Sequence, residues 1–357
     1  MINNYKPQFL SYLHSFRGFA NLNIVAIHAI GLALIICNSH DPKDPFNIAN
    51  ELLFHNSTIY FAVISGLLFS LVLDRKGYKA FYSSKFKNVL LPYLFLTCLF
   101  SIFIFSPQNP FAVDTDHYPA NALRNFIYGK AQFTYWYIPV LIFLYAVTPV
   151  LNYIMKSRWG IYITVLIILL PLLISRVELI DSVQTDSLSL RTMIYFTGAY
   201  AAGMLFGREP ETYFAGVRIN MLLLILITLC SSAALLYFEF HDVDKFGFWS
   251  LRSTLFYIQK MCLSGIIIVA YKSRGIRQPR WLFPIANNAF AIYFLHAFCL
   301  LIMYALLMQF GALSTSFPLN FLLTAVLLFL SSILMSILIA WIFKKLLGKY
   351  SKMFVGA

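Results

Sequence analysis

Long apolar stretches, separated by short polar segments, constrain this chain more than any other feature of its sequence. The first, residues 11–37, is long enough to cross a bilayer as one helix, since about 20 apolar residues span the hydrocarbon core. The chain is 60% hydrophobic and 11% charged, whereas a soluble domain is about half apolar and about a quarter charged. We therefore predict an all-α polytopic membrane protein with about ten transmembrane helices, near residues 13–37, 54–73, 88–106, 134–155, 159–176, 191–207, 218–238, 251–271, 284–309 and 318–343.

The basic residues fall mostly on one side of these predicted helices. If the N-terminus is cytoplasmic, 19 of the 27 Lys and Arg residues lie on the cytoplasmic side with three acids, and seven lie opposite with eleven acids. Because cytoplasmic loops are enriched in Lys and Arg, we predict that both termini are cytoplasmic. The net charge of +13 then reflects the topology, and the basic residues can bind anionic ligands and lipids. We expect no nucleic-acid partner.

The sequence predicts one integral-membrane domain over residues 1–357, with no separate soluble domain. The first apolar stretch lacks the pattern of a cleaved signal peptide, so we expect it to be retained. The longest predicted outer loop, residues 107–133, is expected to be ordered and able to cover a cavity. The five cysteines form no close pair, so neither a disulfide framework nor a metal site is expected.

Arg17 and His28 in the first apolar stretch are the candidate catalytic pair. Eleven helical steps make about three turns, so both side chains lie on one face, roughly 16 Å apart along the axis. Asn21 lies one turn from Arg17 on the same face. Ionisable side chains face protein or water in a membrane, so this stripe predicts a polar cavity. The imidazole of His28, with an ordinary pKa of about 6.5, is suited to a general base.

Simpler interpretations stay open for both residues. Arg17 lies near the cytoplasmic end, where a basic side chain often extends to lipid headgroups. An intramembrane histidine such as His28 can form a hydrogen bond between helices without any catalytic role.

Further polar residues in the apolar stretches are candidates for substrate binding. His296 is a second mid-membrane histidine, and Lys260 lies midway along the eighth stretch. Trp136 and Tyr137 begin the fourth stretch, where aromatic residues either anchor a helix at the interface or stack on sugar rings. Asn21, Tyr137 and Lys260 are candidates for stabilising an oxyanion.

Two shorter motifs follow in and after the second stretch. The pair Ser65 and Gly66 favours close helix packing, and no nucleophile motif surrounds the serine. The densest basic segment follows and contains Arg75, Lys85 and Lys87. It is either ordinary cytoplasmic charge that contacts headgroups or a loop that binds phosphates on the same membrane side as Arg17.

The order of these motifs resembles membrane acyltransferase family 3, the bacterial O-acyltransferases that modify surface polysaccharides. The matching segments span nearly the whole chain: residues 16–20 (FRGFA) with His28, residues 61–66 (FAVISG), the basic run into residues 91–93 (LPY), residues 136–139 (WYIP) with Pro149, and residues 292–296 (IYFLH). Arg17 and His28 match the family's Arg-x10-His motif. The chain departs from the family's Arg-x-x-Arg motif, because lysines and Asn88 occupy that region.

The resemblance implies an acetyl-CoA-dependent O-acyltransferase of the bacterial inner membrane. The donor phosphates would meet Arg17, Arg75, Lys85 and Lys87, and His28 would take a proton from the acceptor hydroxyl. The acceptor would be a sugar of a cell-surface glycan, such as O-antigen, or of its lipid-linked precursor. No metal is expected.

A transporter of an acylated metabolite or a glycan is the alternative, since it also explains many spans and buried histidines. The sequence lacks a clear inverted repeat with broken helices, which many transporters contain. The acceptor, the acyl chain, the membrane side of the acceptor and the oligomeric state stay open.

Overall fold

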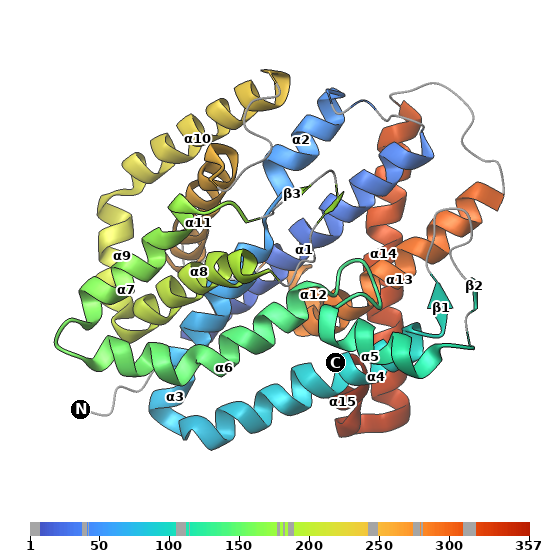
Figure 1. The fold of residues 1–357 in the computed structure, drawn as a ribbon, viewed down its shortest axis with the longest axis horizontal. Coiled ribbons are helices and arrows are strands. Elements are labelled where there is room, and N and C mark those ends of the chain that lie inside the picture. The colour runs from blue at the N-terminus through green and yellow to red at the C-terminus, as the bar shows by residue number, and fades with distance from the viewer. Residues whose placement is uncertain are drawn as a thin grey trace. The chain divides into compact units, whose positions relative to one another are not determined.

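The computed structural model describes residues 8–37, 41, 43–104, 112–113, 115–176, 179–180, 183–184, 189–241, 249–273, 279, 281–309 and 319–357. Side chains are described for these residues except 8–10, 72–75, 104, 179–180, 183–184 and 319. The described chain is mainly helical (Figure 1), which confirms the predicted all-α class.

The α-helices, in chain order, are α1 (Gln8–Ile36), α2 (Pro45–Phe54), α3 (Thr58–Lys85), α4 (Leu91–Phe100), α5 (Tyr118–Tyr128), α6 (Tyr137–Lys156), α7 (Gly160–Leu169), α8 (Leu190–Arg208), α9 (Pro210–Ile219), α10 (Met221–His241), α11 (Leu251–Ser273), α12 (Leu282–Asn287), α13 (Ala289–Gln309), α14 (Leu319–Leu347) and α15 (Ser351–Val355). A π-helical turn (Phe86–Leu90) joins α3 to α4, and 3₁₀ turns follow α7 (Leu170–Leu173) and α14 (Gly348–Tyr350).

Two predicted outer loops contain helices. Helix α2 begins after Asp44, whose carboxylate accepts the Phe46 N–H, and Pro45 supplies the fixed backbone angle of a first turn. Helix α5 ends at Gly129, whose positive φ of 67° forms a left-handed cap. Two short antiparallel strand pairs lie in other connections: β1 (Phe103–Ile104) with β2 (Ala112–Val113) before α5, and β3 (Leu179–Ile180) with β4 (Val183–Gln184) before α8.

Seven helical segments of the described residues are long and apolar enough to cross a bilayer. They are Ser11–Ile36, Pro45–Leu71, Tyr137–Lys156, Met221–His241, Leu251–Ser273, Ala289–Gln309 and Asn320–Val355. Helices α4 and α7 have only 10 residues each, which is about half the length that a spanning helix needs. The protein is therefore a multi-pass membrane protein, while ten spans and cytoplasmic termini stay predictions.

The chain folds into two compact units, each built from three separate stretches. Unit 1 comprises Met1–Ala20, Asn56–Tyr82 and Val140–Ala286, and unit 2 comprises Asn21–His55, Ser83–Pro139 and Asn287–Ala357. Helices α1 and α3 contribute to both units, because each crosses a boundary within its length. The prediction of one integral domain is not tested by this division.

In unit 1, α3 and α8 pack with their backbones in contact. A Cβ atom on Gly66 would lie 2.1 Å from the Tyr200 carbonyl oxygen, and one on Gly203 would lie 2.1 Å from the Val63 carbonyl oxygen. Only glycine fits such an approach, which is typical of small residues at transmembrane helix contacts. The close packing expected at Gly66 is thus confirmed.

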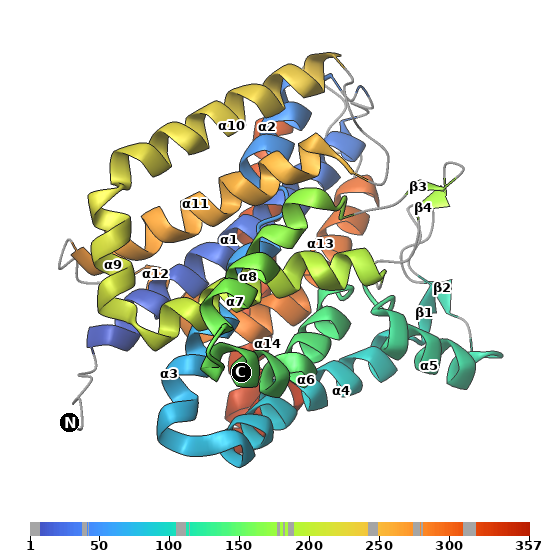
Figure 2. The same ribbon diagram turned by 60° about the vertical axis from the view of Figure 1, so that its left-hand side comes forward.

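Elsewhere in unit 1, α10 and α11 run side by side (Figure 2).

Tyr82 compensates for a proline inside α6 of unit 1. Pro149 has no N–H to donate to the Tyr145 carbonyl one turn earlier. The Tyr82 hydroxyl donates to that carbonyl instead, at 2.9 Å. One turn away, the Asn152 amide donates to the Tyr78 hydroxyl at 2.8 Å. These bonds attach the end of α3 to α6 after the kink at Gly77, where φ is 70°.

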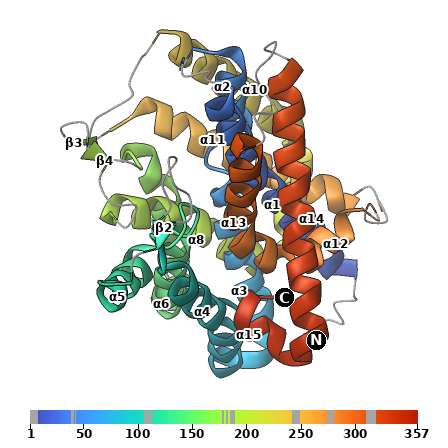
Figure 3. The same ribbon diagram turned by 90° about the vertical axis from the view of Figure 1, so that its right-hand side faces the viewer.

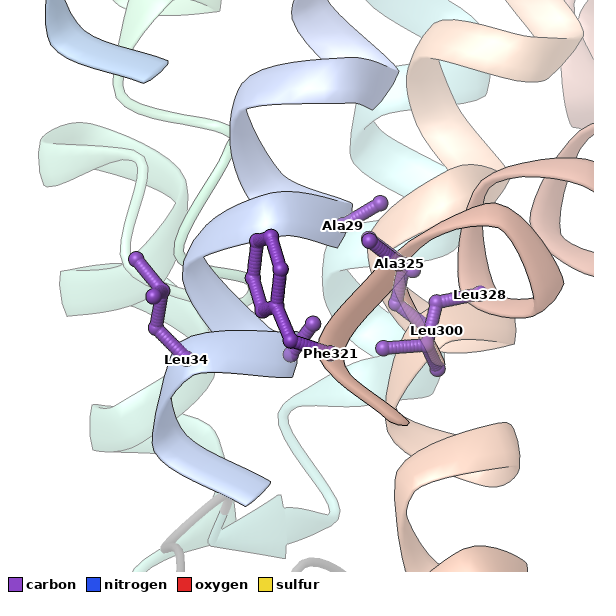
Figure 4. Packing of buried hydrophobic residues seen from close by; sticks show 7 residues of the cluster. Ala29, Leu34, Leu300, Phe321, Ala325 and Leu328 are labelled. Atoms are coloured by element: carbon purple, nitrogen blue, oxygen red, sulfur yellow. The ribbon is translucent and has the colours of Figure 1, made fainter. Parts of the chain in front are cut away.

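The core of unit 2 joins α1, α13 and α14 through small and apolar side chains (Figure 4). Ala29 and Ala33 of α1 are fully buried, as are Leu300 of α13 and Leu328 of α14. Helix α14 lies along α13, and the terminal α15 packs on α4 (Figure 3). The Phe95 and Phe354 rings meet there with centroids 5.0 Å apart. His28 directly precedes Ala29 and so adjoins this packed core.

We expect Gly203→Ala to destabilise unit 1, because its methyl group would lie against the α3 backbone, which cannot move aside as a side chain can. Overpacking of this kind costs about 1–3 kcal/mol, measurable as a lower thermal midpoint of the detergent-purified protein. Gly216→Ala in α9 is the control, since no atom lies within 4 Å of its added Cβ. Equal midpoints for both variants would contradict the close contact.

Candidate active site

Helix α1 is unbroken from Gln8 to Ile36, so the spacing of its three candidate residues, Arg17, Asn21 and His28, is that of a regular helix. Asn21 is buried, and its amide donates to the Ala289 carbonyl at 2.8 Å, which ties α1 to the start of α13. His28 is half-buried further along α1. Both belong to unit 2, whereas Arg17 belongs to unit 1.

His28 lies beside His296 within unit 2. Their ring centroids are 5.7 Å apart and the planes are inclined by 31°. His28 forms no hydrogen bond with any described residue, and the residue as a whole is half-buried. His296 is fully buried in α13. The structure therefore brings together two histidines that are 268 positions apart in the sequence.

The backbone around His296 determines which of its ring nitrogens carries the proton. Nδ1 lies 2.9 Å from the carbonyl oxygens of Ile292 and Tyr293, so a neutral ring donates its Nδ1–H there. Nε2 is then left with a lone pair, and it is buried without a partner in the described structure. Nε2 of His296 is thus a hydrogen-bond acceptor without a partner in the described structure. The ring of the half-buried His28 lies beside this ring.

Residues 131–137 form a wall next to this pair. The Phe133 ring meets the His28 ring edge-on, with centroids 5.0 Å apart. The Tyr293 hydroxyl donates to the Thr134 carbonyl at 2.6 Å, and the Tyr135 hydroxyl donates to the Phe294 carbonyl at 2.7 Å. These two bonds fix the wall to α13 on either side of Phe294. The burial of Tyr135 shows that it is a core residue and does not anchor the chain at a lipid interface.

Several buried polar atoms in unit 2 have no partner among the described residues. They are Oδ1 of Asn21, Oδ1 of Asn50, both amide atoms of Gln132, Oγ1 of Thr134 and Nε2 of His296. Asn50 adjoins His28, because its amide donates to the Ile27 carbonyl at 3.2 Å. An unsatisfied buried polar group costs about 1–3 kcal/mol. Buried polar groups without a partner are a feature of sites that a ligand completes.

Gln132, Thr134 and Asn50 were not singled out from the sequence. Gln132 directly precedes the aromatic-rich residues 133–137. A polar residue beside such a segment is only a weak indication of a functional site. Asn50 lies in a segment that was expected to be an outer loop, whereas it is 4% exposed in α2. Its burial depends on the tertiary fold.

Trp136 and Tyr137 lie at the end of the wall. Tyr137 is buried and Trp136 is half-buried, with their ring centroids 5.8 Å apart in an edge-on arrangement. Their predicted role in binding a sugar is not tested. Lys260, in α11 of unit 1, is fully buried, and the Ser264 hydroxyl donates to its carbonyl at 2.8 Å. Its assignment to the substrate site also stays a prediction.

Arg17 binds the end of the short helix α12 within unit 1. Its Nη2 donates to the Ala286 carbonyl at 2.8 Å and lies 3.2 Å from Nδ1 of His14. A cation at a helix C-terminus is favoured by the exposed carbonyls. Nε of Arg17 is buried without a partner, and no described carboxylate pairs with the guanidinium. Part of its donor capacity is therefore available to an anion.

The basic segment after the second stretch is helical, so its prediction as a loop was wrong. Helix α3 continues to Lys85, which is half-buried, and the π-helical turn contains the exposed Lys87. Pro92 cannot donate to the Asn88 carbonyl, which accompanies this wider turn. The backbone of Arg75 belongs to α3, and its side chain lies outside the described residues.

The family model described as an acyltransferase domain, that of acyltransferase family 3, matches residues 10–344. No curated protein and no solved structure matches the chain. The matched range contains every candidate residue of the sequence analysis and covers nearly the whole chain. The protein therefore belongs to acyltransferase family 3, as its motifs indicated, and is a multi-pass membrane acyltransferase.

Proposed function

We propose that this protein transfers an acyl group, the acetyl group of acetyl-CoA, to a hydroxyl of a bacterial cell-surface glycan or of its lipid-linked precursor. The observation that carries the proposal is the half-buried His28 beside the buried His296, whose Nε2 has no partner in the described structure. Membership of the acyltransferase family favours this reaction over the transporter alternative.

In the proposed reaction, His28 acts as the general base. A ring nitrogen of His28 takes the proton of the acceptor hydroxyl as the hydroxyl oxygen bonds to the thioester carbonyl carbon. The C–S bond of the tetrahedral intermediate then breaks, and the proton passes from His28 to the thiolate. The products are an ester and free coenzyme A. Two imidazoles with ring centroids 5.7 Å apart suit this step, since His296 provides a polar neighbour to His28.

The developing charge on the carbonyl oxygen needs a hydrogen-bond donor. Among the residues proposed from the sequence, Asn21 uses one of its two amide N–H groups on the Ala289 carbonyl. Gln132 is 1% exposed, its amide has no partner in the described structure, and it precedes the Phe133 ring that contacts His28. We assign the Gln132 amide as the donor to this oxygen, since preorganised donors stabilise such oxyanions.

The donor phosphates are proposed to bind Arg17 together with Arg75, Lys85 and Lys87. All four residues lie on the predicted cytoplasmic side. The support is the unused donor capacity of Arg17 and the accessibility of Lys87. Lysine supplies charge without the bidentate fork of arginine. Trp136, Tyr137, Lys260 and His296 are proposed to contact the acceptor. The proposed location is the bacterial inner membrane.

We expect His28→Ala to lower the rate of coenzyme A release by about 10²–10⁴-fold, the usual contribution of a positioned base. The measurement is thiol release from acetyl-CoA by the detergent-purified protein, with the acceptor glycan present and no membrane gradient. His241→Ala is the control, because His241 is an exposed histidine at the end of α10. A wild-type rate in folded His28→Ala would refute the role of the base, and gradient-dependent release would favour transport.

Gln132→Leu separates a catalytic amide from a structural one. Removing an unsatisfied buried amide leaves the thermal midpoint unchanged or raises it, since an apolar side chain carries no desolvation cost. Loss of an oxyanion donor lowers kcat by about 10²–10³-fold. Unchanged kcat would contradict the assignment, and so would a fall in kcat that merely follows a fall in stability.

Arg17→Gln is expected to raise the KM for the acyl-CoA donor about tenfold or more, because a hydrogen bond between charged groups contributes about 1.5–3 kcal/mol. Arg17→Lys should recover part of that affinity, since it keeps the charge and loses the fork. If both variants keep the wild-type KM and only lose thermal stability, the role of Arg17 is only to stabilise α12 through its hydrogen bond to Ala286.

A further inference from the structure

Unit 1 contains a cleft of about 440 Å³ at the junctions of α6 with α7 and of α8 with α9. Its volume is within the range of small-molecule sites. The polar residues that line it are Ser157, Arg158, Thr164, Arg208, Glu209 and Thr212. None of them belongs to the candidate active site described above.

The turn between α6 and α7 fixes the shape of this cleft. A Cβ atom on Gly160 would lie 2.5 Å from the Ile154 carbonyl oxygen, so only glycine allows the chain to turn this tightly. The turn is closed by bonds from the Ser157 N–H to Ile154 and from the Gly160 N–H to Ser157. Arg158 is consequently held at the tip of a short, rigid turn.

Two arginines give the cleft its cationic character. Arg208 donates through Nη1 to the Met155 carbonyl at 2.5 Å, which orients its guanidinium. Arg158 lies against the Trp159 ring, 5.8 Å from its centroid, and is exposed. Within the described chain, no carboxylate forms a salt bridge with either arginine. Glu209 also lines the cleft, so the lining keeps a net positive charge.

Hydroxyl and apolar groups complete the lining. Thr164 is 1% exposed, and its hydroxyl has no partner among the described residues. Ile161, Leu205 and Phe206 supply an apolar wall, and the Phe206 ring stacks on Tyr213 with centroids 3.7 Å apart. Guanidinium groups and hydroxyls together match the oxygens of a phosphate, and the apolar wall suits the organic part of the same molecule.

We propose that this cleft binds a phosphate-bearing organic anion through Arg158 and Arg208. Two molecules offer this chemistry on the predicted cytoplasmic side: the nucleotide portion of a coenzyme A thioester and the headgroup of an anionic phospholipid. The inference does not depend on the proposed catalytic roles, because its test measures binding and not turnover.

The test uses the detergent-purified full chain and two probes, adenosine 3′,5′-bisphosphate and short-chain phosphatidylglycerol, in calorimetric titrations. Arg158→Gln is expected to weaken binding of at least one probe about tenfold or more. Arg218→Gln is the matched control, because Arg218 is an exposed arginine of α9 outside the cleft. Thr164→Val should also weaken binding while leaving the thermal midpoint unchanged or raised, since it removes an unsatisfied hydroxyl.

Each outcome of these titrations has one meaning. Weaker binding of the nucleotide alone identifies the donor molecule as the occupant and moves its phosphates from the site proposed at Arg17 to this cleft. Weaker binding of the lipid alone identifies a headgroup. Weaker binding of both supports a general phosphate site. The proposal is overturned if neither probe binds the wild-type protein. It is also overturned if Arg158→Gln and the double variant Arg158→Gln/Arg208→Gln bind both probes as tightly as Arg218→Gln does.

Discussion

Polar side chains inside apolar helices cannot rely on water, so each needs a partner from the protein or from a ligand. In unit 2 this requirement is met for Nδ1 of His296 by two carbonyls and for the Asn21 amide by a third. It is not met within the described residues for Nε2 of His296 or for the amide of Gln132. The contrast marks the region beside His28 as the one that we propose for the substrate.

Close helix packing makes this arrangement rigid. Helix association in a membrane depends on van der Waals contact and hydrogen bonds, because lipid tails are as apolar as the side chains. Gly66 and Gly203 provide that contact in unit 1, and Ala29 and Ala33 provide it in unit 2. Tyrosine hydroxyls then attach irregular backbone to helices, as Tyr135 does at the wall of the site and Tyr82 does at the proline of α6. Packing and hydrogen bonds thus position the groups to which we assign roles in the proposed reaction.

Periodicity and hydropathy were sufficient to predict the helical class, and motif order was sufficient to predict the family. Arg17, Asn21 and His28 could be proposed from the sequence because one helix spaces them on one face, which requires no tertiary information. Gln132 and Asn50 were missed, since their burial arises from segments that sequence patterns predict as loops. The basic run was also misjudged as a loop, because a kink at Gly77 and a π-helical turn let it stay helical despite its charge. The pairing of His28 with His296 could be proposed only as a shared polar interior, because no local pattern relates positions so far apart.

The most direct test of the central claim is an experimental structure of the protein with a non-hydrolysable acyl-CoA analogue bound. The account predicts that the carbonyl carbon of the analogue lies within about 5 Å of a His28 ring nitrogen, which leaves space for an attacking hydroxyl between them, since reacting atoms approach to about 3–3.5 Å. It also predicts that the carbonyl oxygen accepts a hydrogen bond from the Gln132 amide. A bound analogue whose acyl group lies far from His28, or a His28 ring turned toward lipid, would contradict it.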